Sequence, residues 1–513
     1  MKNLFVGLRF ILLSLTAYSQ AVNDSLYLYK QNFEDLQFSK NAVSQLLMLP
    51  VIRASMAQLS FAGQTGGYRQ AQVAQSSHVT EFSAEGIAKL KRFKVSGYFA
   101  YSRTSDDSLA WNQQGLSNQD RPYYFASAKA GPYQRDQFHM GGQLGFELAK
   151  NQWYIGSGID YLYNTATRSV DPRPSVKTFR LMLKPELFYM VPGQAFGLGV
   201  IWGTGYEENG ISYTKDAYRE NTSEIYKPWI TYFLTGYGSA YPQRSIININ
   251  RDQKFKGSYL SYNGNIGVWK LKGIVSYLLS EENNRSGLIT SLGFDNIANY
   301  QVEKLNAAFL LSYKASKLSH QIKFDLNKDD GTGYYNRIGG KNYYMTHKDY
   351  HAEYNVMLDR FERVTPGFTA GITYENIRRR DLSVYSSNDY AWFQPYIGMA
   401  IYDHINKLND ISATMDIFTL LPIKNQITAP VATVTEFTKG IVFPDYYYYK
   451  SIGGGMTATV NYISSSLLQG FRSGIGFQVG YNHKLSSPPV TLPASFIAST
   501  NRLTYGLNLN LYF

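Results

Sequence analysis

The chain has 513 residues, with 50 Lys and Arg against 38 Asp and Glu, which gives a formal net charge of +12. Only 17% of its residues are charged, whereas 15% are aromatic, including 44 Tyr, and the mean hydropathy is −0.29. Low charge with many aromatics and a polar average is typical of a membrane β-barrel, which has an apolar outer surface and a polar interior. The sequence has no cysteine, which excludes disulfides, thiolate metal sites and a cysteine nucleophile.

The first 21 residues are typical of a secretory signal peptide. Two basic residues, Lys2 and Arg9, precede an apolar run around 10–15, and small residues suited to cleavage follow at 19–21. The apolar run is too short to span a bilayer as a helix, and no later run reaches about 18 apolar residues. We therefore expect residues 1–21 to be removed and the mature chain to be exported without a helical anchor.

Residues 22–55 precede the predicted barrel. A short helix is predicted within 32–49, where Leu36, Leu46 and Leu47 are apolar and Pro50 follows as a helix stop. The segment is interpreted as an N-terminal arm, a small plug or a linker. It is far shorter than the globular plug of a TonB-dependent transporter.

The sequence has a regular strand pattern along the whole mature chain. Apolar residues alternate with glycine or polar residues at 153–163, 196–203 and 471–482, so each strand has one face against an apolar environment. Short polar connections alternate with long ones, as the turns and outer loops of outer-membrane barrels do. We therefore predict an all-β fold, a single transmembrane antiparallel β-barrel of about 18 strands (range 16–20) over residues 56–513.

Two further features of the predicted barrel can be checked directly. A first strand near 56–66 must pair with the last strand to close it, and residues 225–253 contain two further candidate strands. Long outer loops are expected at 105–135, 165–176, 205–253, 282–302, 327–349, 378–389, 421–453 and 485–500.

The last segment of the chain alternates strictly and ends on phenylalanine. Leu509, Leu511 and Phe513 share one face, and Asn508 and Asn510 share the other. In water a bare leucine face on a terminal strand would promote aggregation. The ending resembles the terminal strand of outer-membrane barrels, which the barrel-assembly machinery reads. Leu509, Leu511 and Phe513 are therefore predicted to form the assembly signal.

No motif predicts a metal site or an enzyme. The spacing of Asp325 and Asn327 resembles a calcium loop, but Asp330 stands where glycine is required, so an acidic turn is the better interpretation. His347 and His351 have helical metal-binding spacing in a segment interpreted as loop entering strand. A serine hydrolase in the barrel wall is a minor alternative. We expect no catalytic residue, no metal and no cofactor.

Three charged residues are candidates for lining the lumen. Arg180, Lys184 and Glu186 alternate with apolar residues and are predicted to point inward. They either select solutes in a pore or form an ion-pair network that fills a closed barrel.

Two tyrosine clusters fall on predicted outer loops. They offer rigid amphipathic surface to a glycan, an apolar ligand or a partner protein, or they serve as a structural girdle and loop packing. The candidates are Tyr334, Tyr335, Tyr343, Tyr344, Tyr446, Tyr447, Tyr448 and Tyr449.

Taken together, the strand rhythm, the Ser19–Gln20–Ala21 signal ending, the tyrosine richness and the terminal Phe513 resemble an outer-membrane β-barrel of the Bacteroidota. The chain is most similar to uncharacterised families in which a domain of unknown function covers nearly the whole mature chain. The resemblance implies a location in the bacterial outer membrane and transfers no functional residue.

The expected function is a channel or transporter for small solutes. The alternatives are a scaffold or accessory subunit of an outer-membrane protein complex and an apolar-ligand transporter with a lateral opening. The expected partners are outer-membrane lipid and lipopolysaccharide, the barrel-assembly machinery and an outer-membrane protein. Nucleic acid is not an expected partner.

Overall fold

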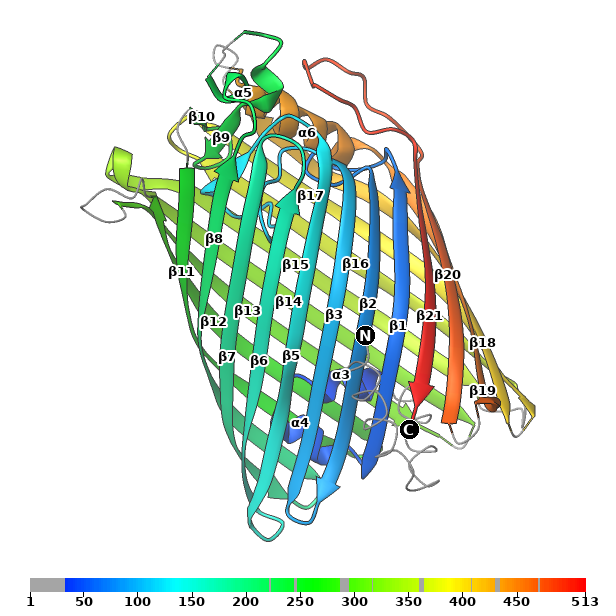
Figure 1. The fold of residues 1–513 in the computed structure, drawn as a ribbon. Helices are drawn as coiled ribbons and strands as arrows, with labels where there is room; N and C mark the ends of the chain where they lie inside the picture. The colour runs from blue at the N-terminus through cyan, green and yellow to red at the C-terminus, as the bar shows by residue number, and fades with distance from the viewer. Residues whose placement is uncertain are drawn as a thin grey trace, which may run out of the picture.

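A computed structural model describes residues 33–513 apart from 221–222, 244–246, 287–294, 316, 359–363, 407, 430–433 and 469–470. Within these residues, eighteen strands form one closed antiparallel barrel (Figure 1). The predicted all-β barrel and its strand number are confirmed. The predicted signal peptide, 1–21, lies outside the described residues.

The barrel strands are long, up to 21 residues in β17. They are β1 (Arg53–Gly66), β2 (Ser76–Leu90), β3 (Phe93–Leu109), β5 (Gly131–Ala149), β6 (Trp153–Arg168), β7 (Arg173–Val191), β8 (Gln194–Ser212), β11 (Ile247–Ile266), β12 (Trp269–Ser286), β13 (Asp295–Lys314), β14 (Leu318–Tyr335), β15 (Gly340–Leu358), β16 (Val364–Asp381), β17 (Ser386–Asn406), β18 (Asn409–Thr428), β19 (Gly453–Leu468), β20 (Phe471–Lys484) and β21 (Asn501–Tyr512).

Pairing of the first and last strands closes the barrel. β1 runs antiparallel to β21, with Leu59 opposite Leu509 and Phe61 opposite Leu507. Closure gives every strand two neighbours, so no edge is left to aggregate. The predicted pairing of the segment near 56–66 with the chain terminus is confirmed.

The outward face carries an apolar belt. Large side chains such as Trp202 (58% exposed), Ile397 (65%) and Phe477 (55%) point away from the lumen, while their neighbours along each strand point inward. Successive strand side chains point to opposite faces, so the alternation in the sequence produces this belt. A continuous apolar belt around a barrel is unfavourable in water and suits a lipid environment.

Four predicted long loops are wrong over their described residues. The segments 165–176, 327–349 and 378–389 are mostly strand, because β6 and β7, β14 and β15, and β16 and β17 continue almost to tight turns. The described residues of 282–302 belong to β12 and β13. Outward residues in these extensions are polar, so the apolar alternation fades although the strands do not end. Residues 225–253 likewise add no extra barrel strand. They contain β9 (Thr231–Leu234) and β10 (Ala240–Gln243), which pair in a separate small sheet.

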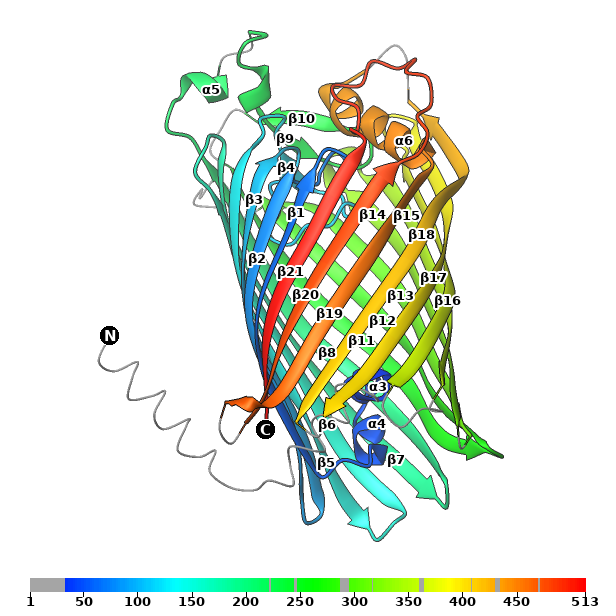
Figure 2. The same cartoon turned by 90° about the vertical axis from the view of Figure 1, so that its right-hand side faces the viewer.

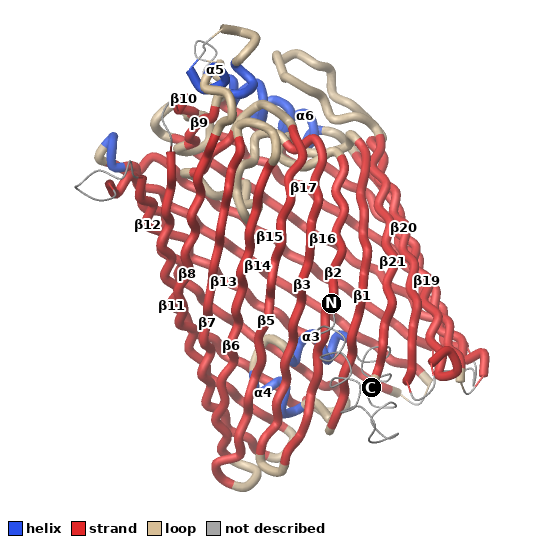
Figure 3. The backbone as a smooth tube through the Cα atoms, viewed as in Figure 1, coloured by secondary structure: helices blue, strands red, loops and turns tan. Residues whose placement is uncertain are grey.

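The two ends of the barrel differ (Figures 1 and 3). We call the end with tight turns and the C-terminus the short-turn end, and the opposite one the long-loop end. The long-loop end carries β4 (Tyr124–Ala126), β9, β10, α5 (Ala217–Glu220), α6 (Phe443–Lys450), the 3₁₀ helices η1 (Lys227–Trp229) and η2 (Asn336–Ile338) and the π-helix η4 (Thr438–Val442).

Two short helices lie inside the barrel toward the short-turn end, in both side views (Figures 1 and 2). They are α3 (Phe33–Ser39) and α4 (Val43–Met48), in the segment predicted as an arm or small plug. No helix in the described part of the chain is long and apolar enough to cross a membrane.

Candidate functional site

The lumen is divided into three layers. Residues 33–51, with α3 and α4, form what we call the helix plug at the short-turn end. The strands β4, β9 and β10, together with η4, α6 and their connecting residues, form the loop plug at the long-loop end. Between and beside the two plugs lies what we call the hollow layer, two cavities lined by side chains of the wall. The larger cavity reaches Met56 and Tyr512, close to the short-turn ends of β1 and β21.

The helix plug fits against the wall because glycines leave room for it. A Cβ on Gly145 of β5 would lie 2.3 Å from Leu47 Cδ1, and one on Gly156 of β6 would lie 2.5 Å from Val43 Cγ1. Val43 also packs with the buried rings of Tyr154 and Phe188. These inward glycines therefore form the seat for α4.

Glu186 of β7 holds the start of α4. Its side chain is 2% exposed, and its Oε2 accepts hydrogen bonds from the Val43 N–H at 2.7 Å, the Ser44 N–H at 3.3 Å and the Tyr259 hydroxyl at 3.1 Å. Its Oε1 accepts one from Ser261 at 3.0 Å. Free N–H groups at a helix start favour a negative charge, so this buried carboxylate secures the plug.

Ion pairs tie α3 and the turn after it to the wall at separate points. Asp35 meets Lys272 of β12 at 2.8 Å and Glu34 meets Lys323 of β14 at 3.1 Å. On the opposite side Lys40 meets Glu85 of β2 at 2.5 Å. Polar contacts therefore hold the helix plug on several sides. The Lys272 side chain is 1% exposed, whereas those of Lys40 (37%) and Lys323 (28%) are open to water.

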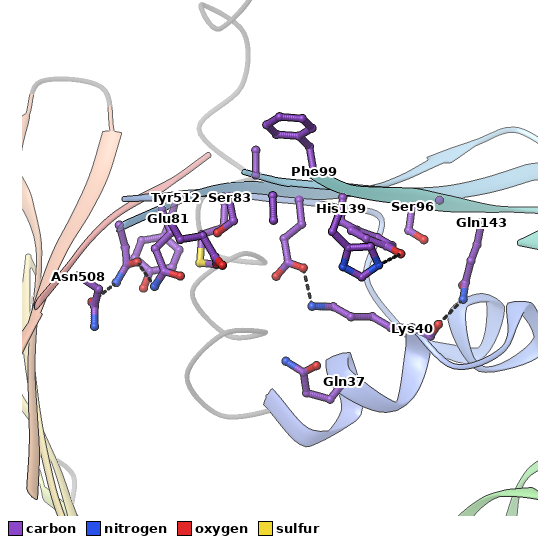
Figure 4. Close-up of a pocket in the computed structure, with 18 of the residues that line it drawn as sticks. Gln37, Lys40, Glu81, Ser83, Ser96, Phe99, His139, Gln143, Asn508 and Tyr512 are labelled. Atoms are coloured by element: carbon purple, nitrogen blue, oxygen red, sulfur yellow. Dashed lines mark hydrogen bonds and ion pairs between the residues drawn. The ribbon is translucent and has the colours of Figure 1, made fainter. Parts of the chain in front are cut away.

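The hollow layer contains two adjacent cavities. The larger has a volume of about 920 Å³ and the smaller about 540 Å³, and Asn41 and Lys184 border both. Figure 4 shows Gln37 and Lys40 on the helix-plug side of the larger cavity and His139 and Gln143 on the wall. The helix plug therefore forms part of the wall of the hollow layer.

Asp160 of β6 organises the wall of the larger cavity. Its carboxylate lies 2.9 Å from His139 Nε2, accepts a hydrogen bond from the Tyr98 hydroxyl at 2.6 Å and meets Arg180 at 3.4 Å. Sequence reasoning singled out Arg180 but missed its partners. Asp160 stands on the polar face of the predicted strand 153–163, which was the available signal.

Carboxylates outnumber amines around the hollow. In the described part of the chain the two cavities are lined by the amines of Lys40 and Lys184 and by the carboxylates of Glu81, Glu85, Asp160, Asp325 and Asp349. Three of these carboxylates have a cation beside them, Glu85 with Lys40, Asp160 with Arg180 and Asp325 with Lys323. Glu81 and Asp349 against Lys184 leave a small negative excess, which favours cations over anions.

The loop plug has an aromatic core. Phe125 of β4 lies opposite Phe233 of β9 in the small sheet, with the ring centroids 5.9 Å apart. Trp111, Phe437 and Val442 are buried in the same cluster. The outer loops therefore fold into the barrel mouth as a packed unit.

A buried ionic network joins the loop plug to the wall. Arg121 lies 2.8 Å from Glu282 of β12 and 3.5 Å from Glu207 of β8. Arg251 of β11 pairs with both carboxylates and donates a hydrogen bond to the Tyr123 carbonyl at 2.8 Å. Removing one partner of such a network leaves an uncompensated buried charge, which is strongly destabilising.

Asp120 is the second ionic contact of the loop plug. Its carboxylate accepts from Arg379 of β16 at 2.7 Å and lies 2.8 Å from His347 Nδ1. Burial alone raises the pKa of Asp120, but the Arg379 guanidinium and the His347 imidazole hold it well below its usual range. Asp120 and Arg121 were missed by sequence reasoning, because two charges in an irregular loop give no periodic signal.

The structure gives the three predicted lumen residues different surroundings. Lys184 lines both cavities, Arg180 is engaged by Asp160, and Glu186 is buried under α4. Of the three residues predicted to select solutes, only Lys184 lines both cavities. Glu186 instead anchors the helix plug.

The predicted tyrosine clusters separate into buried and exposed members. Tyr335, Tyr343, Tyr447 and Tyr449 are buried, while Tyr334 and Tyr344 are exposed on the outside of β14 and β15, and Tyr446 and Tyr448 of α6 are half-buried. The Tyr447 hydroxyl accepts hydrogen bonds from the Thr491 and Leu492 N–H groups at 2.7 and 2.6 Å. The buried members pack and brace the outer loops, so they offer no free binding surface.

The predicted metal-like spacings adopt strand geometry. Asp325 and Asn327 lie within β14, so the expected acidic turn is wrong, and His347 and His351 lie four residues apart on β15. At about 3.3 Å per strand residue, that spacing separates the two histidines by roughly 13 Å. In the described part of the chain no group of three or more His, Asp or Glu side chains is placed to hold a metal.

The predicted assembly signal lies on the closing strand. Leu509 and Leu511 are exposed on the outward face of β21, and the Phe513 N–H donates to the Ser55 carbonyl at 3.1 Å. Their role in assembly stays a prediction.

These features define a large barrel with a hollow, polar interior closed by two internal plugs. The chain belongs to a family of unknown function, DUF6850, whose sequence profile matches residues 44–513. This confirms the expected resemblance to an uncharacterised barrel family covering nearly the whole mature chain, and the Bacteroidota origin stays a prediction.

Solved structures similar to this chain include large barrels. The FrpB iron transporter from Neisseria meningitidis matches with a TM-score of 0.44 and 7% identity, over 91% of this chain and 82% of that chain. The copper transporter OprC matches at 0.41 and 7% over 90% and 80%, and the ferric citrate transporter FecA at 0.41 and 9% over 90% and 79%. Such low values carry no argument about cargo. No curated protein matches this chain.

Proposed function

We propose that this protein is a gated transporter of small polar solutes in the bacterial outer membrane. The apolar outward belt of a closed barrel supports the membrane location, because a closed barrel satisfies its backbone hydrogen bonds without water. In this proposal the long-loop end faces outward and the short-turn end, with Phe513, faces the periplasm.

The observation that carries the proposal is the hollow layer between the two plugs. A cavity of about 920 Å³ lies within the range of roughly 300–1,000 Å³ that small-molecule sites occupy. Its wall combines polar and apolar side chains and carries Glu81, Glu85 and Asp160 against Lys40 and Lys184, so a neutral or cationic solute fits it better than an anion. In this proposal a solute enters the layer past the loop plug and leaves it at the short-turn end, past the helix plug.

The helix plug is the better candidate for the moving gate. Its helices have 7 and 6 residues, which is too short for stability without their tertiary contacts. Those contacts are ion pairs and three small apolar clusters, whereas the loop plug has one large aromatic core. Displacing α3 and α4 opens a route from the hollow to the short-turn end.

A reversible lock tests this gate. The Ser44 and Ser261 Oγ atoms lie 2.6 Å apart, close enough for the double variant Ser44→Cys/Ser261→Cys to form a disulfide. The natural chain has no cysteine, so these are the only thiols. Liposomes containing the full mature protein are assayed for swelling in sugars and amino acids. We expect oxidation to abolish swelling and reduction to restore it.

The single variant Ser261→Cys is the matched control, and its swelling should not respond to oxidation. Equal swelling of the oxidised and reduced double variant would contradict gating by the helix plug. Failure of the wild type to admit any solute would contradict transport itself.

A scaffold or accessory role is the second candidate. The packed loop plug favours it, because a mouth filled by an aromatic core also suits a barrel that conducts nothing. Purification of the native protein from its membrane then recovers a stoichiometric partner, whereas a gated transporter is recovered alone.

A further inference from the structure

The outer wall carries a concentrated group of basic side chains. Lys328 of β14, Lys348 of β15, Arg378 of β16 and Lys424 of β18 line a shallow groove of about 450 Å³. Lys328, Arg378 and Lys424 are 39–46% exposed. We call these four residues the outer basic patch.

The patch contains more positive charge than the wall itself neutralises. Asp330 meets Lys328 at 2.6 Å, while Asp389 is shared by Lys424 at 2.6 Å and Arg378 at 3.8 Å. Among the described residues Lys348 has no ion pair or hydrogen bond partner. Glu303 of β13, opposite Asp330 in the strand register, also acts on Lys328, so three carboxylates serve four cations.

The strand register increases the imbalance. Lys328 and Lys348 are directly opposite each other in the pairing of β14 with β15. Like charges directly opposite on neighbouring strands are destabilising. By contrast, Lys256 of β11 faces the Glu281 carboxylate of β12 at 3.3 Å. A bound anion would relieve the repulsion between Lys328 and Lys348.

The patch lies at the upper border of the apolar belt. Tyr350, Tyr374 and Phe393 form an aromatic row on β15, β16 and β17, with neighbouring ring centroids 5.7 and 5.3 Å apart. Lys348 is two residues from Tyr350, and Arg378 is four residues from Tyr374. At about 3.3 Å per residue the cations stand roughly 7–13 Å beyond this row, where lipid headgroups begin.

We propose that the outer basic patch binds the phosphate-bearing sugar headgroup of an outer-leaflet glycolipid, whose acyl chains lie along the apolar belt below. Arg and Lys side chains are the natural donors to phosphate. The adjoining belt distinguishes this ligand from a free anion, which has no use for an apolar surface. The proposal rests on the outer-membrane location in the proposed function and is independent of transport.

Native mass spectrometry of the folded, full mature protein in detergent tests the proposal. The probes are phosphorylated lipid A, the same lipid A after enzymatic dephosphorylation, and inorganic phosphate. We expect retention of phosphorylated lipid A by the wild type and a loss of roughly fivefold in affinity for each cation removed. The variants are Lys328→Gln/Lys348→Gln and Arg378→Gln/Lys424→Gln, and Lys256→Gln is the matched control.

Two results would overturn the proposal. One is equal retention of dephosphorylated lipid A by the wild type, and the other is unchanged retention by both double variants with full barrel circular dichroism. Full displacement of the lipid by millimolar inorganic phosphate would identify a free-anion site instead and would also overturn it. Liposome swelling is not involved, so a failure of the transport proposal leaves this result readable.

Discussion

Inward carboxylates in this barrel differ in role according to what surrounds them. Glu186 is buried and accepts four hydrogen bonds, two of them from the backbone of α4. Its carboxylate therefore holds the helix plug and does not face a solute. Glu81 faces the hollow layer and keeps its charge available to a solute. Their sequence context is the same, an inward position on a strand, and only the tertiary fold separates the two roles.

Asp445 of α6 makes the loop plug sensitive to pH. It accepts a hydrogen bond from the Ala71 N–H at 2.8 Å. Burial raises its pKa to about 6, although this hydrogen bond, Arg379 and Arg69 lower it. An unfolded Asp titrates near about 4, so the folded plug favours the protonated acid. Its stabilising contribution is complete below about pH 4 and is lost as the pH rises to about 6.

We therefore expect the loop plug to open less at pH 4.5 than at pH 7, with a difference of about 2 kcal/mol in opening free energy. Hydrogen exchange of the Ala71 amide, corrected for its intrinsic rate, measures this. Asp445→Asn should remove the dependence. Asp120 remains ionised across this range because its pKa is lowered, so Asp120→Asn should weaken the plug at both pH values. Identical pH profiles for wild type and Asp445→Asn would contradict the assignment.

At the scale of elements, the sequence predicted the barrel well and its interior poorly. Alternation located the closing strands β1 and β21 and the strand number, because the lipid-facing side of a strand must be apolar. It failed where β14 and β15 pass beyond the apolar belt, since outward residues such as Lys328 and Lys348 are polar there. The helix plug was predicted only as a short helix within 32–49, without its position in the lumen, because its contacts join residues as far apart as Val43 and Glu186. The loop plug left no periodic signal.

The seat of α4 gives a test at the element scale. A Cβ at Gly145 would meet only side-chain atoms of α4, so Gly145→Val should displace the helix plug and leave β5 intact, at an overpacking cost of about 1–3 kcal/mol. Faster hydrogen exchange at Ser44 and increased liposome swelling are expected. Gly158→Val is the control, because a Cβ there would make ordinary contacts with Lys184 and Gln143 at 3.6 and 3.7 Å. Equal exchange at Ser44 in both variants would show that the glycine is no seat.

The whole molecule distributes its charge unevenly. The sequence has a net charge of +12, and part of that excess lies on the outer basic patch, whereas the hollow layer is lined by more carboxylates than amines. Net charge therefore gives the wrong sign for the interior. A passing ion responds to the local field of the hollow layer. The cations of the outer basic patch lie across the wall and in contact with water, so they change this field only weakly.

We accordingly expect the barrel to prefer cations whenever it conducts. In a planar bilayer under a KCl gradient, the reversal potential of the wild type and of Gly145→Val should shift toward the K⁺ equilibrium potential. We expect a permeability ratio for K⁺ over Cl⁻ of about three or more. Glu81→Gln/Asp349→Asn should lower that ratio, because both carboxylates line the hollow, while Glu281→Gln on the outer wall should not. Anion preference in the wild type would contradict the acidic interior and would return the selecting role to Arg180 and Lys184.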